Sequence, residues 1–284
     1  MQRRSSCIFL VHCHVDGASW NETYAKGQEV RVNDLNIYSV GNTSSSVAII
    51  VIYDIRGFNI SQTRVFCDRL AAEYSVLVVM PDFFRGIAAP THGNISGWLI
   101  STDVGNWSKI SADLITVSSW LRSSYRINQT ALIGFCWGGL QVVRACSNLS
   151  SMFFTGVSIH GSGLTVNEVK LLQRPILFIA AGNDPPLRPN ISDAIAQANP
   201  RISSQCQYET YSNMIHGFVS AGANYSNPDN AAAIDSVHVT VRNYLNNIRS
   251  NNSTTNNTIM NNSVRSSMNF LLLFFICVVG HVYL

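Results

Sequence analysis

The sequence predicts an α/β protein built on a mainly parallel central sheet that is flanked by helices. Apolar runs of strand length recur at Val47–Tyr53, Val76–Met80 and Pro175–Ala181, as expected for parallel strands covered on both faces. Apolar residues at helical spacing lie between two of these runs, in Ser61–Tyr74, and alternation of strand and helix is typical of such a sheet. The length of 284 residues fits one large domain.

The first part of the chain is expected to form one edge of the sheet. Glu29–Val32 and Leu35–Val40 alternate polar and apolar residues, the pattern of an antiparallel hairpin. The first buried strand ends in Asp54-Ile55-Arg56-Gly57, and the second stops at Pro81-Asp82-Phe83-Phe84-Arg85-Gly86. Residues 87–108 are rich in glycine, serine and threonine, which predicts an irregular cap over a pocket.

The remaining elements continue the alternation of helix and strand. A helix that starts at Asp103 or Ser108 runs to Tyr125. The later strands are expected at Ala131–Ile133, Phe153–His160, Pro175–Ala181 and Gln205–Tyr211, with helices at Ser192–Ala198 and Asp229–Arg249.

One turn contains a candidate nucleophile. The run Ala131-Leu132-Ile133 leads into Gly134-Phe135-Cys136-Trp137-Gly138-Gly139. A buried strand that turns sharply into a helix strains the corner residue, and small neighbours let strand and helix pass closely. Cys136 occupies that corner, where the free amides and positive end of the following helix stabilise a thiolate. The alternative is a buried structural cysteine in a glycine-rich turn.

Two further predicted strands end in residues that complete a triad with this cysteine. Catalytic groups of open α/β sheets collect at the carboxyl ends of the strands, and Asp184 and His216 both follow strands. The chain order nucleophile, acid, histidine is that of α/β-hydrolases. Cys136 would attack an acyl carbon, His216 would exchange the proton, and Asp184 would hold the imidazole.

The same arrangement would supply an oxyanion hole from the backbone N–H groups of Trp137 and Ile55. Each side chain also has a structural alternative. Asp184 would suit a turn, His216 a strand end bonded to backbone, and Asp54 a bond to a nearby amide. The coincidence of all these residues in one chain order favours the catalytic interpretation.

The stretch from about Cys13 to Arg249 resembles the dienelactone hydrolase (carboxymethylenebutenolidase) family of the α/β-hydrolase superfamily. The matching segments are, in family order, VIYDIRGFN, VVMPDFFRG, IGFCWGG, LFIAAGNDP and HGF. The resemblance implies an α/β-hydrolase fold. It also implies a Cys-His-Asp triad that hydrolyses lactones or related esters without a metal or other cofactor.

The resemblance further implies roles for residues around the triad. Asp54 matches an acidic residue, usually glutamate, that helps control the thiol proton in the resting enzyme. Arg85 matches one of two arginines that bind the substrate carboxylate in the best-known bacterial members. The second position, four residues after His216, holds Ser220, so a preference for a carboxylated dienelactone does not follow from this sequence.

The composition bears on partners and on the compartment. The formal net charge is only +3, and without a basic cluster it argues against a nucleic-acid partner. Asn-x-Ser/Thr motifs are more frequent than the composition predicts, which indicates a glycosylated protein of the secretory pathway; the alternative is a chain merely rich in Asn and Ser. The candidate acceptors are Asn21, Asn42, Asn59, Asn94, Asn106, Asn128, Asn148, Asn190 and Asn224, followed by Asn251, Asn252, Asn256 and Asn261.

The two ends of the sequence suggest how the protein is located. The uncharged run over residues 270–284 follows a polar spacer over residues 250–269. This run is short for a membrane span and suits a cleaved GPI-attachment signal, although a retained tail anchor on a cytosolic enzyme is the alternative. Residues 1–20 resemble a signal peptide with a short apolar region. The hydrolase domain is expected over residues 21–249.

Cysteine use depends on this compartment. In an oxidising environment, Cys13, Cys67, Cys146 and Cys206 would be able to form two disulfides, with three pairings that the sequence cannot rank.

Together, the observations predict a monomeric, cysteine-dependent hydrolase of small esters or lactones, glycosylated and lipid-anchored at the cell surface. The alternative from another class is a catalytically silent surface glycoprotein that keeps the fold for binding.

Overall fold

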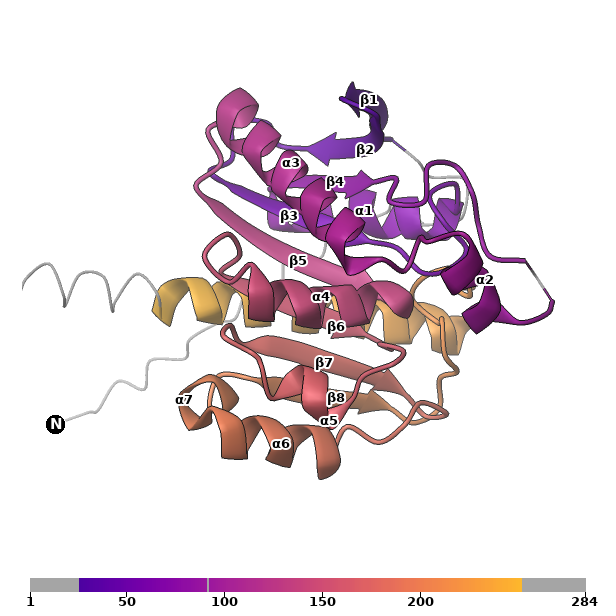
Figure 1. The fold of residues 1–284 in the computed structure, drawn as a ribbon, viewed down its shortest axis with the longest axis vertical. Helices are drawn as coiled ribbons and strands as arrows, with labels where there is room; N and C mark the ends of the chain where they lie inside the picture. Colours follow the sequence, from indigo (N-terminus) through magenta and orange to yellow (C-terminus); the bar gives the residue numbers. More distant parts are fainter. Residues whose placement is uncertain (1–25, 91, 252–284) are drawn as a thin grey trace, which may run out of the picture.

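The computed structural model describes residues 26–90 and 92–251. Its centre is an eight-stranded sheet in the order β1-β2-β4-β3-β5-β6-β7-β8 (Figure 1). The first hairpin pairs antiparallel and β3 to β8 run parallel, so the predicted mainly parallel sheet is confirmed. The strands are β1 Gln28–Val32, β2 Leu35–Gly41, β3 Val47–Ile52, β4 Leu77–Pro81, β5 Gln129–Phe135, β6 Thr155–Ile159, β7 Ile176–Ala181 and β8 Gln207–Tyr211.

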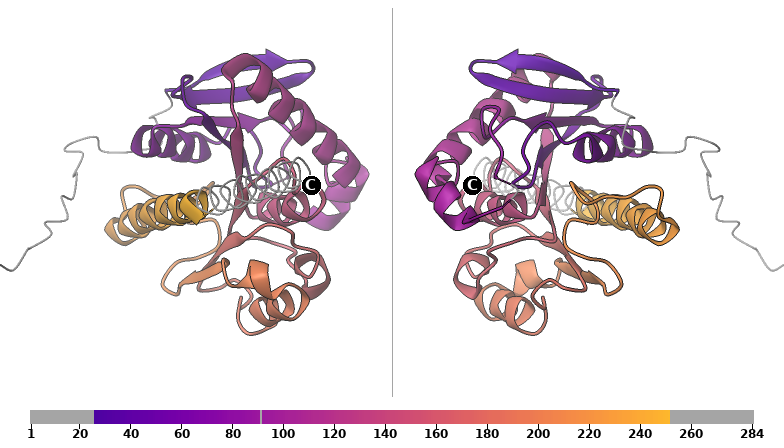
Figure 2. Two further views of the ribbon diagram at one scale, coloured as in Figure 1. Left: turned by 90° about the vertical axis from the view of Figure 1, so that its left-hand side faces the viewer. Right: turned by 90° about the vertical axis from the view of Figure 1, so that its right-hand side faces the viewer.

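Helices cover both faces of this sheet. The first helix and the helical residues 228–251 lie on one face, and the third and fourth helices lie on the other (Figure 2). The helices are α1 Ser61–Tyr74, α2 Ile95–Ser101, α3 Trp107–Tyr125, α4 Trp137–Asn148, α5 Val166–Val169, α6 Asn190–Ala198 and α7 Pro200–Ser203.

The strand pattern follows from burial. Every residue of β3, β4, β6 and β7 is buried, as expected for parallel strands between two helical layers. The edge strands β1 and β8 alternate exposed and half-buried residues instead. The hairpin predicted at a sheet edge is therefore confirmed.

Three short helices were not predicted. Part of the expected irregular cap forms α2, whose first turn is closed by the Asn94 side chain accepting from the Gly97 N–H at 2.9 Å. The one-turn helices α5 and α7 are capped in the same way by Thr165 and Asn199. Such caps stabilise turns too short to show a helical apolar period.

Among residues 26–90 and 92–251, the structure contains none of the disulfides expected for an oxidising compartment. Cys67, Cys136, Cys146 and Cys206 all carry free thiols, and each of the three pairings requires a bond between two of these residues. Cys67 lies on α1 and Cys146 on α4, and these helices lie on opposite faces of the sheet (Figure 2). The sheet therefore separates these two thiols.

Within residues 26–90 and 92–251, the helices are too short or too polar to cross a membrane. Cys13, Asn21, the proposed signal peptide and the apolar run over residues 270–284 lie outside the described residues.

Candidate active site

Cys136 lies at the corner between β5 and α4. Its backbone has φ 51° and ψ −114°, a region that L-residues rarely adopt and that costs on the order of 1–3 kcal/mol. Its carbonyl accepts hydrogen bonds from Gly139 at 3.0 Å and from Ser162 at 2.9 Å, and its N–H donates to Ile159 at 3.1 Å. These three bonds fix the corner at the carboxyl edge of the sheet.

The glycines on either side of Cys136 allow the tight crossing. A Cβ at Gly134 would collide with the carbonyl of Gly138, and a Cβ at Gly138 would collide with the carbonyl of Ile52. The start of α4 therefore packs directly on β3 and β5. The glycine spacing around the predicted nucleophile thus has a steric cause.

His216 and Asp184 meet at the same edge. The His216 Nδ1 lies 2.6 Å from the Asp184 Oδ1. The other oxygen of Asp184 accepts from the Ala181 N–H at 2.7 Å, and the His216 N–H donates to the Asn183 side chain at 2.7 Å. The carboxylate is nearly buried, with 8% of its side chain exposed, whereas 33% of the His216 side chain is exposed.

Asp184 and His216 each shift the pKa of the other so that both charged forms are stabilised. The hydrogen bond that His216 donates to Asp184, followed by interaction with the Cys136 thiol, raises the pKa of His216 to about 10. Burial raises the pKa of Asp184, but the hydrogen bonds from His216 and Ala181 outweigh it and leave that pKa below its usual value. The pKa of His216 is thus raised by both of the residues predicted to flank it.

Two backbone N–H groups near Cys136 have no acceptor among the described residues. Trp137 is the first residue of α4, where helix N–H groups have no intrahelical partner, and Ile55 follows the end of β3. In the described part of the chain, neither N–H has a hydrogen-bond acceptor. These are the two amides expected to form the oxyanion hole.

The carboxylate of Asp54 is bonded to residues other than Cys136, whose thiol proton the resemblance implies that it controls. It is buried, and one carboxylate oxygen accepts from the Ser220 hydroxyl at 2.6 Å and from the Ala221 N–H at 3.2 Å. The other oxygen accepts from the Arg56 N–H at 2.8 Å. Ser220 is itself fully buried, so the two positions that depart from the family pattern bond to each other.

Arg85 is engaged with two carboxylates of the protein. Its guanidinium binds Asp113 through two hydrogen bonds of 2.8 and 2.9 Å and binds Asp34 at 3.0 Å. The guanidinium therefore joins the edge hairpin to α3. The resemblance implies that Arg85 binds a substrate carboxylate, but in this structure the guanidinium is bonded to carboxylates of the protein itself.

Two residues near the triad were missed by sequence reasoning. The Ser162 hydroxyl lies 3.3 Å from the Cys136 sulfur. His160 is fully buried, its ring centroid is 4.8 Å from that of His216, and burial lowers its pKa to about 3. Both residues follow β6, so their place after a strand was the one available signal.

Two of the hollows in the described part of the chain lie close to the proposed triad. One, of about 410 Å³, is lined by Ser162 and Asp184 together with apolar residues that include Leu164, Leu187 and Ile191. Neither lysine nor arginine lines it. Without a cation in its lining, this hollow suits an uncharged group better than an anionic one.

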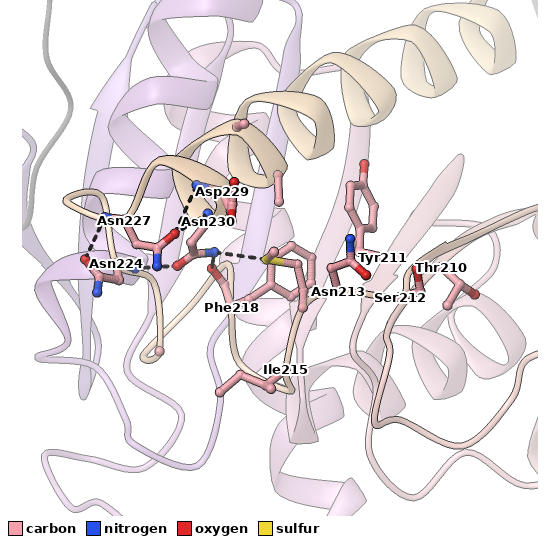
Figure 3. Close-up of a pocket in the computed structure, with 14 residues that line it drawn as sticks. Thr210, Tyr211, Ser212, Asn213, Ile215, Phe218, Asn224, Asn227, Asp229 and Asn230 are labelled. Carbon is pink, nitrogen blue, oxygen red and sulfur yellow. Dashed lines mark hydrogen bonds between the residues drawn. The ribbon is translucent and has the colours of Figure 1, made fainter.

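The other hollow, of about 740 Å³, lies beside the loop that carries His216 and contains no triad residue (Figure 3). The Asn230 amide donates to the Phe218 carbonyl at 3.0 Å and its oxygen accepts from Asn224 at 2.6 Å. The asparagines drawn in Figure 3 thus hold loops together. The residues around this hollow therefore stabilise the loop that carries His216.

Among the residues that the structure describes, no cluster of His, Cys, Asp or Glu side chains has the composition of a metal site.

Comparisons with known proteins agree with this geometry. The model of the dienelactone hydrolase family matches residues 35–248. A carboxymethylenebutenolidase homolog of Rattus norvegicus is 29% identical over 227 residues, which cover 78% of this chain and 90% of the relative. The homolog of Homo sapiens is 28% identical with the same coverage.

Solved structures show the same fold. A dienelactone hydrolase-like promiscuous phosphotriesterase from metagenomic libraries has a TM-score of 0.60 at 17% identity, covering 78% of this chain and 98% of that chain.

Proposed function

Because this chain belongs to the dienelactone hydrolase family, it is a hydrolase acting on esters or lactones, and we propose that it works through a thioester on Cys136. The observation that carries the proposal is the pair His216–Asp184 at 2.6 Å, whose imidazole also interacts with the thiol of the strained corner residue. A nucleophile, a base and a residue that orients the base are the parts such catalysis needs.

The first half of the reaction forms the acyl-enzyme. His216 takes the thiol proton, and the Cys136 sulfur attacks the acyl carbon. The carbonyl oxygen becomes an oxyanion, which accepts from the N–H groups of Ile55 and Trp137. Collapse of this intermediate expels the alcohol, which takes the proton from His216 and leaves a thioester on Cys136.

The second half returns the enzyme to its starting state. His216 takes a proton from water, and the resulting hydroxide attacks the thioester. The carboxylic acid leaves, and the proton returns to the Cys136 sulfur. Asp184 stays ionised throughout and stabilises the imidazolium in both halves.

The substrate class follows from the charges around the site. Arg85 is neutralised by two carboxylates, and Ser220 supplies no charge. The hollow beside Ser162 and Asp184 is lined by both polar and apolar residues, with no lysine or arginine among them. Small uncharged esters or lactones therefore suit this site better than a carboxylated dienelactone.

Hydrolysis of a panel of aryl esters and enol lactones by the purified protein tests the proposal. Turnover should disappear in Cys136→Ala and after thiol alkylation. It should fall by about 100- to 10,000-fold in His216→Ala, the usual share of general acid-base catalysis. Absence of turnover on every substrate, together with slow alkylation of Cys136, would instead favour the silent binding protein.

We also propose that the protein is glycosylated and lipid-anchored. All eight candidate acceptors between Asn42 and Asn224 are exposed, so an oligosaccharide would not disturb the core at any of them. Protein purified from its native membranes should shift in gel mobility on enzymatic deglycosylation and be released by a phospholipase specific for GPI anchors. Release without a mobility shift would contradict glycosylation. A mobility shift without release would contradict the GPI anchor.

A further inference from the structure

We propose that Ser162 controls the charge of the nucleophile, by donating a hydrogen bond from its hydroxyl to the Cys136 thiolate. The inference rests on the proposed function, because it concerns the same sulfur. Its starting point is the distance of 3.3 Å between the Ser162 Oγ and the Cys136 Sγ.

The hydroxyl is available for this bond. In the described part of the chain, the Ser162 Oγ has no hydrogen-bond partner besides the sulfur. Ser162 is an exposed residue, so its hydroxyl can rotate freely. A hydroxyl in this position donates to a thiolate and accepts from a thiol, and donation to the charged form favours ionisation.

The backbone holds Ser162 in place. Its N–H donates to the Cys136 carbonyl at 2.9 Å. The preceding residue, Gly161, packs against the start of α4 so closely that a Cβ at Gly139 would lie 2.7 Å from its Cα. The segment after β6 is therefore fixed against the nucleophile corner, which holds the backbone of Ser162 beside Cys136.

The residue that the resemblance assigns to this task is otherwise engaged. Asp54 directs its carboxylate at Ser220, Ala221 and Arg56. No hydrogen bond joins it to Cys136 within the described residues. In this chain the thiol proton goes to His216, and Ser162 keeps its own proton while it stabilises the sulfur anion.

The rate of alkylation of Cys136 by iodoacetamide, measured against pH and assigned by mass spectrometry, tests the proposal without any substrate. In Ser162→Ala, the inflection of this profile should move up by about one pH unit, which is about tenfold less thiolate below the inflection. Ser162→Thr, which keeps the hydroxyl, should restore the wild-type profile. The pH profile of ester kcat/KM should shift in parallel.

Ser220→Ala is the matched control, because it removes the hydroxyl that Asp54 binds and leaves the sulfur untouched. Its inflection should equal that of the wild type. An unshifted Ser162→Ala profile, a Ser162→Thr profile as shifted as that of Ser162→Ala, or a shift in Ser220→Ala of equal size would each overturn the proposal. If the wild type hydrolyses no ester but Ser162→Ala still shifts alkylation, the proposed function fails while the role of Ser162 stands.

Discussion

At the scale of single residues, the three proposed triad residues follow the order that the family resemblance implies, whereas residues around them depart from it. Cys136, Asp184 and His216 are present in the expected order, and the last two are bonded at 2.6 Å. Arg85, by contrast, is tied to Asp34 and Asp113. The reaction proposed here therefore depends on residues shared with the family, whereas the substrate depends on residues that differ.

Arg85→Gln separates a structural role from a substrate-binding role. The substitution leaves the carboxylate of Asp113, whose side chain is 12% exposed, without its bidentate partner. The free energy of unfolding should fall by about 1–3 kcal/mol, as measured by urea denaturation. The ratio of kcat/KM for a carboxylated ester to that for its neutral analogue should stay unchanged. A large selective loss with the carboxylated ester would return Arg85 to substrate binding.

At the scale of elements, the junction of β5 and α4 is the part of the fold that the site needs most. The helix begins one residue after the nucleophile, and its first turn touches the end of β3. Strand β3 also leads into Ile55, so one junction places both the sulfur and the two amides that we propose for the oxyanion hole.

Gly138→Ala should disrupt this junction. The new Cβ would collide with the backbone carbonyl of Ile52, which cannot rotate away as a side chain would. We expect a loss of at least about 2 kcal/mol of stability, within the range of overpacking, and a loss of esterase activity that exceeds the unfolded fraction. Gly105→Ala is the control, because its Cβ would meet its nearest neighbour at 3.6 Å. Equal stability of the two variants would contradict the steric argument.

The helices and strands could be predicted from the sequence, and so could the candidate triad, which stays a prediction, whereas the contacts around Cys136 and Asp54 could not. The unbroken apolar run of β3 has the length of a buried strand. Cys136 and His216 lie in the short motifs GFCWGG and HGF. Ser162 and the Asp54–Ser220 bond could not be predicted, because they join segments that are 26 and 166 residues apart in the sequence. Contacts of this kind depend on how loops pack at the edge of the sheet, which no local pattern records.

At the scale of the whole molecule, two buried histidines should limit stability in acid. His160 and His238 are both fully buried, and their ring nitrogens have no hydrogen-bond partner in the part of the chain that the structure describes. Burial, followed by nearby positive charge, lowers the pKa of His160 to about 3 and that of His238 well below its usual value. At mildly acidic pH these two histidines therefore stay neutral in the native state, whereas in the unfolded chain they are protonated.

The sign of this effect is fixed by those pKa values. Above the unfolded pKa of about 6.5 neither state binds the protons, and stability is retained. As the pH falls from 6.5 towards 3, the unfolded state binds up to two more protons, so stability should fall by up to about 2.7 kcal/mol per pH unit. In His238→Phe, which keeps a ring against Phe66, the slope measured by denaturation at pH 6.5 to 4 should be about half. An unchanged slope would contradict this assignment.

The hydrogen bond between Asp54 and Ser220 makes these two positions a matched pair. The Asp54 carboxylate already lies 2.6 Å from the Ser220 hydroxyl, so a glutamate at position 54 would collide with it. An arginine at position 220 would have to fit into a site where the serine is fully buried. Neither position can change alone towards the glutamate or arginine of the bacterial members without disturbing the other. A lineage moving between the two arrangements must therefore substitute both, and relatives should carry aspartate with serine or glutamate with arginine far more often than mixed pairs.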